Sequence, residues 1–335
     1  MPAVAIDIGT YSVKAISGNP GAKPAIKRVA EVFNTTGLAV PTDDASIEKM
    51  ALLVESVFAD YDLPRNEVRV AIPETVVSTK VIPLPPLTDA ELASAINWQA
   101  EQHIPIPPEE LSLEYQVVFR PKGNDKQPMR VLLVGVRKTV IDNYVNLFHS
   151  IGIEPILIET QILSIMRSLQ FVPEDPTTLI VHIGASNMNM ALVHQAELKF
   201  VLSHLNGGQL LTKALEQTLA MDATQSEQYK RTYGLDSDQF QGKIREAMMP
   251  AAQLLTAEIK KSLQFFVNQN PKESVKRIVL SGGTALLPGF VQFITDETGA
   301  EVLVSAPFTN ATGDVAPQVN QPSMTVCMGL MSREL

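Results

Sequence analysis

The chain has 335 residues, of which 45% are hydrophobic and 19% charged, with a formal net charge of −9. This composition supports a folded core and excludes a largely disordered chain, and the length suggests about two domains. The acidic balance argues against a general nucleic-acid binder, which needs a basic face. The single Cys327 excludes an internal disulfide and a cysteine-based zinc site, and the five histidines show no metal-ligand spacing.

The first 66 residues predict three strands and a helix. Strands are expected over residues 3–8, 12–17 and 26–33, with a glycine turn after the first strand. Apolar residues over 46–61 recur at the spacing of a helix with one buried face. The N-terminus lacks the basic segment and apolar core of a signal peptide, and no stretch reaches the roughly 20 apolar residues that span a bilayer. We therefore expect a cytoplasmic protein that reaches a membrane only through a partner.

Residues 67–137 predict a small inserted α/β unit. Its strands are expected over residues 68–72, 77–81, 113–119 and 129–136, with a turn at 121–125. Thr88 and Glu91 form a capping box that begins a helix ending near residue 103. A helix over 139–150, a strand over 155–158 and a helix over 161–169 then return to the larger body.

The second half predicts the same opening as the first. Strands are expected over 179–183, 188–193 and 198–203, helices over 208–220, 226–233 and 240–266, a strand over 277–280 and helices over 288–298 and 325–331. Residues 6–15 (IDIGTYSVKA) match residues 181–190 (VHIGASNMNM), which lie 175 positions later. Because both segments read as strand, glycine turn and strand, we expect two similar lobes with both turns at the mouth of one cleft.

The first of these hairpins carries the chemistry of an anion site. The turn over Gly9–Ser12 presents backbone N–H groups and hydroxyls, and glycine lets a phosphate approach closely. Lys14 lies on the same face of the returning strand as Ser12 and can neutralise phosphate charge. Asp7 precedes the turn and can hold Mg²⁺, which takes one or two carboxylates and keeps several waters.

Three glycine turns follow one another along the chain, at Gly9, at Gly184 and over residues 281–284. In this order they resemble those of the superfamily of actin, heat-shock chaperones and sugar kinases. The resemblance implies a two-lobed actin-like (ribonuclease H-like) α/β fold that clamps ATP with Mg²⁺ between its lobes. The implied binding residues are Asp7, Gly9, Thr10, Tyr11, Ser12 and Lys14 in the first hairpin; Gly184, Ala185, Ser186 and Asn187 in the second; Gly207, Gly208 and Gln209 at a helix start; Glu258, Lys261 and Ser262 on a later helix; and Gly282, Gly283 and Thr284 in the adenosine turn.

The insert resembles the one shared by the cell-division protein FtsA and the type IV pilus assembly protein PilM. Residues 88–92, 96–105, 113–117, 131–138 and 258–266, together with the glycine turn at 281–284, are similar to the PilM pattern, so the resemblance covers nearly the whole chain. It implies a first lobe of residues 1–66 and 138–175, an insert of 67–137, and a second lobe of 176–335 whose helix at about 323–333 returns to the first lobe. It also implies that the protein captures the cytoplasmic N-terminal tail of PilN in a groove between the first lobe and the insert, linking it to the inner-membrane platform of the pilus machine.

Two residues depart from the superfamily pattern. His182 begins the second hairpin where aspartate is usual, and we expect a hydrogen-bonded strand histidine, since hydrated Mg²⁺ prefers oxygen ligands. Gln161 stands where this family more often has glutamate; a carboxamide can orient a water but cannot act as a base. Both changes favour binding over turnover, so we expect slow or absent ATPase activity, with Gln161 the one candidate for a water-orienting role.

Two other functions remain as alternatives. A sugar or acetate kinase of the same superfamily needs a base near its substrate, and the second hairpin supplies no aspartate. An FtsA-like filament or membrane-binding protein ends in a basic amphipathic helix, whereas residues 331–335 (MSREL) contain no such segment.

Overall fold

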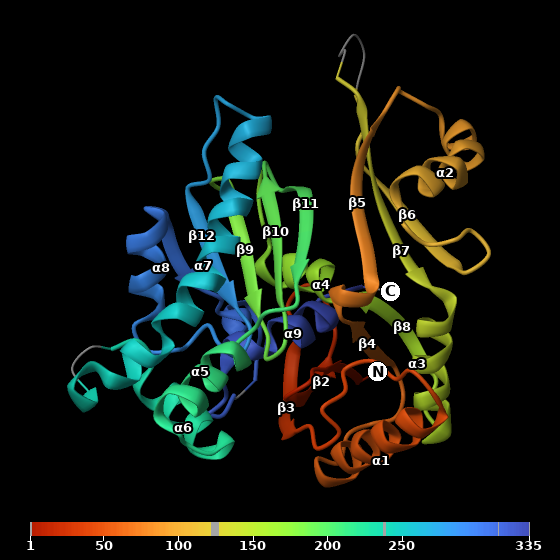
Figure 1. Ribbon diagram of the computed structural model, residues 1–335. Helices are drawn as coiled ribbons and strands as arrows, with labels where there is room; N and C mark the ends of the chain where they lie inside the picture. Colours follow the sequence, from red (N-terminus) through yellow and green to blue (C-terminus); the bar gives the residue numbers. More distant parts are fainter. Residues whose placement is uncertain (1, 122–126, 237–238, 314, 335) are drawn as a thin grey trace.

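Two five-stranded sheets and one three-stranded sheet organise the described part of the chain (Figure 1). The computed structural model describes residues 2–121, 127–236, 239–313 and 315–334. The first sheet has the order β3-β2-β1-β4-β8, and the second has the order β11-β10-β9-β12-β13. The strands of the first sheet are β1 (Ala3–Ile8), β2 (Ser12–Asn19), β3 (Ala25–Phe33), β4 (Val68–Ile72) and β8 (Pro155–Thr160). Those of the second are β9 (Thr178–Ile183), β10 (Met188–His194), β11 (Glu197–His204), β12 (Arg277–Ser281) and β13 (Glu301–Val304).

The two large sheets repeat one topology. In each, three antiparallel strands are followed by two parallel ones. The fourth strand along the chain pairs with the first, and the fifth pairs with the fourth. The internal repeat expected from residues 6–15 and 181–190 is therefore confirmed. The strand β13, which completes the correspondence with β8, has only four residues and was not predicted from the sequence.

Helices cover the outer faces of both large sheets. We call the first sheet with α1 (Asp44–Asp60) and α3 (Lys138–Ser150) the first lobe. The second lobe is the second sheet with α5 (Gln209–Leu219), α6 (Ala223–Tyr233), α7 (Lys243–Gln269) and α8 (Phe290–Thr298). The helix α7 begins three residues later than expected, because Phe240 and Gln241 have φ of 51° and 55° and interrupt the helical backbone.

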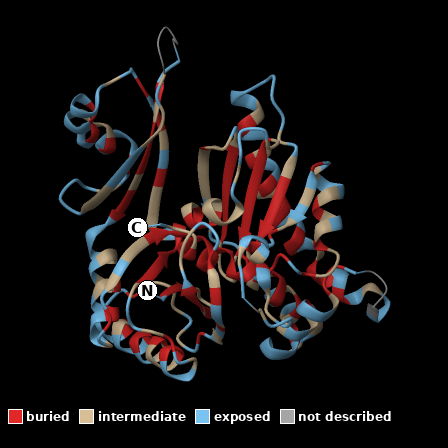
Figure 2. Ribbon diagram, turned by 180° about the vertical axis from the view of Figure 1, so that it is seen from behind, coloured by how far each residue is buried: buried red, intermediate tan, exposed pale blue. Residues whose placement is uncertain are grey.

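A central layer joins the lobes. Between the two sheets lie α4 (Gln161–Leu169) and α9 (Thr325–Met331), as Figure 1 shows, and their apolar side chains pack against both sheets in one cluster. Strand alternation explains this arrangement: Ala3 and Ala5 of β1 face the central layer, while Val4 and Ile6 face α1 and α3. The inner strands of both sheets are buried on both faces, as Figure 2 shows by their red colour.

The insert is a separate sheet with one helix. It contains β5 (Val77–Leu84), β6 (Leu111–Phe119) and β7 (Met129–Arg137) in the order β5-β7-β6, and α2 (Asp89–His103) packs on one face. The predicted capping box is present, since the Thr88 side chain accepts from the Glu91 N–H and Glu91 accepts from the Thr88 N–H. The turn expected at 121–125 lies almost entirely outside the described residues.

The expected start of the insert at residue 67 is wrong by one strand. The strand β4 pairs in parallel with β1 and β8 in the first sheet, where all five of its residues are buried. A parallel strand covered on both faces reads as a continuous apolar run, and this run does not distinguish one sheet from another. The insert's sheet therefore begins at Val77. Among the described residues, no helix combines the length and apolar character needed to cross a bilayer.

Candidate functional site

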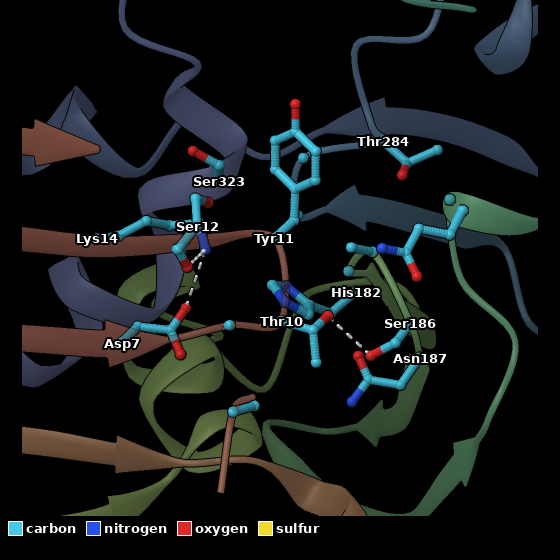
Figure 3. Close-up of a pocket in the computed structure, with 18 of the residues that line it drawn as sticks. Asp7, Thr10, Tyr11, Ser12, Lys14, His182, Ser186, Asn187, Thr284 and Ser323 are labelled. Atoms are coloured by element: carbon cyan, nitrogen blue, oxygen red, sulfur yellow. Dashed lines mark hydrogen bonds and ion pairs between the residues drawn. The ribbon is translucent and has the colours of Figure 1, made fainter. Parts of the chain in front are cut away.

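The two repeated hairpins meet at one cavity between the lobes (Figure 3). The cavity has a volume of about 300 Å³, and both Gly9 and Gly184 line it. The Thr10 Oγ1 donates a hydrogen bond of 3.0 Å to the Ser186 Oγ, so the turns touch directly. The central expectation from the sequence, that paired turns from the two halves share one crevice, is confirmed.

Most of the residues expected from the sequence line this cavity. They are Asp7, Gly9, Thr10, Tyr11, Ser12, Lys14, Gln161, Gly184, Ala185, Ser186, Asn187, Gly208, Gln209, Gly282, Gly283 and Thr284. Gly207 lies behind the second hairpin rather than on the cavity wall. A Cβ on Gly207 would come within 2.6 Å of the Ala185 carbonyl oxygen and of the Asn187 nitrogen, so glycine is needed for this backbone approach.

The structure does not place Glu258, Lys261 and Ser262 at this cavity. All three lie on α7 and are absent from the described lining. Glu258 instead pairs with Lys261 at 2.6 Å, and the buried Ser262 donates to the Glu258 carbonyl oxygen.

The same Glu-x-x-Lys spacing occurs on α6, and that copy does line the cavity. Glu227, Lys230 and Arg231 all contribute to the wall. The Lys230 Nζ donates to Glu227 Oε2 at 2.6 Å and to Thr212 Oγ1 at 2.9 Å, and these contacts hold a lysine that is only 7% exposed. Burial lowers the pKa of Lys230, while the pairing with Lys230 and Arg231 overcomes the burial of Glu227 and lowers the pKa of Glu227. Charge and spacing alone did not distinguish the two helices.

Arg231 also connects the lobes at the mouth of the cavity. Its guanidinium lies 5.0 Å from the ring centroid of Tyr11, and the Tyr11 ring meets Phe33 edge-on at 5.2 Å. A guanidinium at this distance over an aromatic face is attracted to it. Burial raises the pKa of Tyr11, so its hydroxyl stays protonated at neutral pH. This contact joins the first hairpin to α6 of the second lobe.

The first hairpin places charged side chains at one end of the cavity. Asp7 and Lys14 are directly opposite each other on β1 and β2, and the Lys14 Nζ lies 3.5 Å from the Asp7 Oδ2 (Figure 3). Lys14 also donates to the Ser12 carbonyl oxygen at 3.4 Å. The Ser12 hydroxyl donates to Glu31 at 2.8 Å. These contacts of Lys14 are long, so its ammonium is the least firmly held of the cations at the cavity.

Gln161 begins α4 and faces Asp7. Its Nε2 donates a hydrogen bond of 2.7 Å to the Asp7 Oδ1. The helix begins here because the Thr160 side chain accepts from the Leu163 N–H. The amino group of Gln161, rather than its oxygen, therefore faces the carboxylate.

His182 is a buried, neutral strand histidine. It is 6% exposed, and its Nδ1 lies 3.1 Å from the Ser281 Oγ. The same Ser281 hydroxyl also lies 3.3 Å from the Pro322 carbonyl oxygen. Burial lowers the pKa of His182 to about 4. The expectation that His182 is a hydrogen-bonded strand residue is confirmed.

The glycine turn before α5 docks onto the second hairpin. The Gly208 N–H donates to the Gly184 carbonyl oxygen, and the Gln209 N–H donates to the Ala185 carbonyl oxygen, both at 2.8 Å. These two amides of the helix start therefore support the hairpin instead of pointing freely at the cavity. Elsewhere on the wall, the Asn320 Nδ2 donates to the Gly283 carbonyl oxygen at 3.2 Å and thereby holds the glycine turn over residues 282–284. Asn320 also lines the cavity and was not expected from the sequence.

A buried glutamate supports the floor of the cavity. Glu74 is 3% exposed, and its Oε1 accepts from the Ile162 N–H at 2.9 Å, at the start of α4. It lies in the short 3₁₀ helix η1 (Glu74–Val76), between Pro73 and Thr75, which line the cavity. Burial raises the pKa of Glu74 from 4.5 to about 7.

This carboxyl makes folding stability depend on pH. Between pH 4.5 and 7 the folded chain keeps the proton of Glu74 and the unfolded chain does not, so its contribution is lost as pH rises through this window. As the pH rises from 4.5 to 8, we expect the free energy of unfolding of Glu74→Gln to increase by about 3 kcal/mol relative to that of the wild type. Urea unfolding of both proteins at several pH values measures this difference. An offset that stays constant with pH would contradict it.

Comparisons with known proteins agree on one fold. A family model described as "Type IV pilus assembly protein PilM" matches residues 5–331. The cell division protein FtsA of Streptococcus pneumoniae serotype 2 is 24% identical over 353 aligned positions, which cover 90% of this chain and 75% of FtsA. The solved structure described as "PilM-PilN type IV pilus biogenesis complex" matches with a TM-score of 0.84 at 22% identity, over 98% of this chain and 97% of that one.

More distant structures share the same architecture. The ethanolamine utilization protein EutJ of Carboxydothermus hydrogenoformans matches with a TM-score of 0.60 at 14% identity, over 99% of this chain and 89% of that one. MreB5 of Spiroplasma citri, solved with AMPPNP bound, matches with a TM-score of 0.53 at 12% identity, over 98% and 94%. The expected actin-like fold is thus confirmed. Because the family model spans nearly the whole chain, this chain belongs to the PilM family of type IV pilus assembly proteins.

Proposed function

We propose that this chain is a cytoplasmic, ATP-binding adaptor of type IV pilus assembly that binds the N-terminal cytoplasmic tail of PilN. Through that tail it would link to the inner-membrane platform. The observation that carries the nucleotide part is the convergence of both hairpins on one cavity, with Thr10 and Ser186 in contact across it. Family membership and the match to a PilM-PilN complex support the partner.

The charges of the cavity indicate how ATP would lie. Lys14 and the two hairpin turns form an end that suits a triphosphate, because backbone amides, hydroxyls and an ammonium group all favour anions there. The opposite part of the wall comes from α6 and from the turn over residues 282–284, where Arg231 offers a planar cation to a base or ribose. ATP binding would replace the direct Thr10–Ser186 hydrogen bond with contacts to phosphate.

Magnesium would be held mainly by the nucleotide. Among the described residues, no group of three or more His, Cys, Asp or Glu side chains forms a metal site. Asp7 is the carboxylate of the first hairpin, and the repeated position holds the neutral His182. One carboxylate with several waters and phosphate oxygens suits Mg²⁺, so the residues fit an ion that arrives on ATP and meets Asp7 through water.

The partner site would involve the insert. In the PilM family the tail is expected between the first lobe and the insert. Here the insert is continuous with the first lobe at both ends, since η1 separates β4 from β5 and α3 follows β7 without a gap. ATP would stabilise the arrangement that grips the tail only if it binds that arrangement more tightly than the alternative.

A pull-down with a synthetic PilN N-terminal peptide tests the adaptor role. The full chain is incubated with immobilised peptide, with and without Mg²⁺ and ATP, beside a peptide of the same composition in scrambled order. Retention by the native order alone, increased by ATP, supports the proposal. Equal retention by both peptides contradicts specific capture.

The two Glu-x-x-Lys helices supply a matched pair of variants for the nucleotide site. Arg231 and Lys261 are both half-exposed or more and each follows a glutamate partner, but only Arg231 lines the cavity. We expect Arg231→Ala to weaken ATP binding about fivefold, the value of one lost charged contact at a partly exposed site, and Lys261→Ala to leave it unchanged. Titration calorimetry of both variants with ATP checks this. An equal loss of affinity in both would indicate that the adenine base of ATP lies away from α6.

A further inference from the structure

A chain of side-chain hydrogen bonds crosses the floor of the cavity from one lobe to the other. The Gln161 Nε2 donates to Asp7 on β1 at 2.7 Å, and the Asn189 Nδ2 on β10 donates to the Gln161 Oε1 at 3.3 Å. The Ser203 Oγ on β11 then donates to the Asn189 Oδ1 at 2.8 Å. These hydrogen bonds connect four residues in sequence: Asp7 on β1, Gln161 on α4, Asn189 on β10 and Ser203 on the edge strand β11.

The direction of this chain is set at its Asp7 end. An ionised carboxylate can only accept, so Gln161 must present its amino group to Asp7 and its oxygen to Asn189. Asn189 is fully buried and Gln161 is 6% exposed, so each amide needs these partners. The orientation of Asn189 follows from that of Gln161, and the Ser203 hydroxyl follows from that of Asn189.

The opposite direction satisfies the same groups only when a further group stands between Gln161 and Asp7. A hydroxyl donates or accepts, so Ser203 can take a hydrogen bond from a reversed Asn189 as well as give one. In that state Gln161 would present its oxygen towards Asp7, and two acceptors would face each other. Lys14 approaches the other carboxylate oxygen, Oδ2, so a hydrated cation at Oδ1 would be needed to supply donors to both oxygens. The chain therefore has one complete arrangement without such a cation and another with it, and occupancy at Asp7 selects between them.

We propose that Gln161, Asn189 and Ser203 form a reversible relay that reports occupancy at Asp7 to the edge strand β11. This inference rests on the proposed binding of Mg²⁺ with ATP. Asn189 and Ser203 are positioning residues, since neither is among the described residues that line the cavity.

The far end of the relay reaches the insert. Strand β11 packs against β5 and η1, and Leu198 and Val201 of β11 join the cluster that contains Leu132 and Val81 of the insert. Arg130 of β7 also pairs with Glu197 at the start of β11 at 2.5 Å. A change in the position of β11 would therefore alter the contacts between the second lobe and the insert. Coupling between sites is carried by such contiguous groups when they have two discrete arrangements.

Side-chain amide NMR of the full chain tests the relay directly. The protein is labelled with ¹⁵N at Asn and Gln side chains and at Gly backbones, and is titrated with ATP in the presence of Mg²⁺. We expect the Asn189 side-chain amide to shift with the same half-saturation as the Gly9 and Gly184 backbone amides. Shifts at Gly9 and Gly184 with none at Asn189 would overturn the relay. No shift at any of them would instead contradict nucleotide binding itself.

Ser203→Ala distinguishes the relay from general closure of the lobes. Ser203 is exposed and is not among the described residues that line the cavity, and alanine removes the hydroxyl that a reversed Asn189 would donate to. We expect ATP with Mg²⁺ still to shift Gly9 and Gly184, while the shift at Asn189 is reduced. If Asn189 shifts as in the wild type, the signal comes from lobe movement and the relay is wrong.

Discussion

Replacing Lys14 by alanine is expected to weaken ATP binding by about thirtyfold, because one charge-assisted contact to phosphate contributes about 2 kcal/mol. Three basic side chains line the described cavity: Lys14, Lys230 and Arg231. Both Lys230 and Arg231 are paired with Glu227 at 2.6 and 2.7 Å, whereas Lys14 reaches Asp7 only at 3.5 Å. The charge of Lys14 is therefore the one most available to a phosphate.

Displacement of a fluorescent ATP analogue measures this loss. Lys49→Ala is the control, because it removes the same charge from an exposed position on α1 that does not line the cavity. The loss in Lys14→Ala should shrink as salt is added, since partly exposed charges are screened. Equal affinities in the wild type and in Lys14→Ala would contradict the assignment of the first hairpin to the phosphates.

Gly329→Ala is expected to destabilise the fold by about 3 kcal/mol, near the upper end of the usual cost of overpacking. A Cβ at this position of α9 would lie 1.7 Å from the Ser164 carbonyl oxygen and 2.8 Å from the Ser164 Cα on α4. Alanine gains about 1 kcal/mol in helix propensity over glycine, so the overlap must outweigh a favourable local term. The atoms in conflict are backbone atoms, and one of the two helices must therefore move.

The helix α9 has little freedom to move away. The Arg69 Nη1 donates to the Leu330 carbonyl oxygen at 2.9 Å, and the Arg167 Nη1 donates to the Gly329 carbonyl oxygen at 3.0 Å. Arg333 also pairs with the buried Glu159 at 2.8 Å. Thermal and urea unfolding compare Gly329→Ala with Gly283→Ala, where an added Cβ meets nothing within 4 Å. Equal stability of the two variants would show that α4 and α9 are not closely packed.

The sequence predicted the parts of the fold that local pattern determines. The repeat of strand, glycine turn and strand at Gly9 and Gly184 predicted the two lobes and the shared cavity, because both hairpins follow the same local pattern. The strand β4 was assigned to the wrong sheet, since its apolar run is equally compatible with either neighbour. Pairing in a parallel sheet depends on contacts between distant segments, which no local pattern contains.

The site was predictable to the same extent. The hairpin residues follow from turn chemistry, but the choice between Glu227-x-x-Lys230 and Glu258-x-x-Lys261 depends on which helix packs beside the cavity. Similarly, the sequence indicated a polar role for Gln161 and gave no sign that its amide donates to Asp7, which lies 154 positions earlier. Asn189 was not singled out at all, because a buried asparagine in a strand has no local signature of its partners.

Isothermal titration of ATP with Mg²⁺ into the full chain tests the central claim most directly, namely that both hairpins enclose one triphosphate. We predict saturable heat with one site per chain, and a large loss of that heat in Gly207→Val, where the added side chain would displace the second hairpin. No heat at millimolar nucleotide, together with no competition against a fluorescent analogue, would contradict the account.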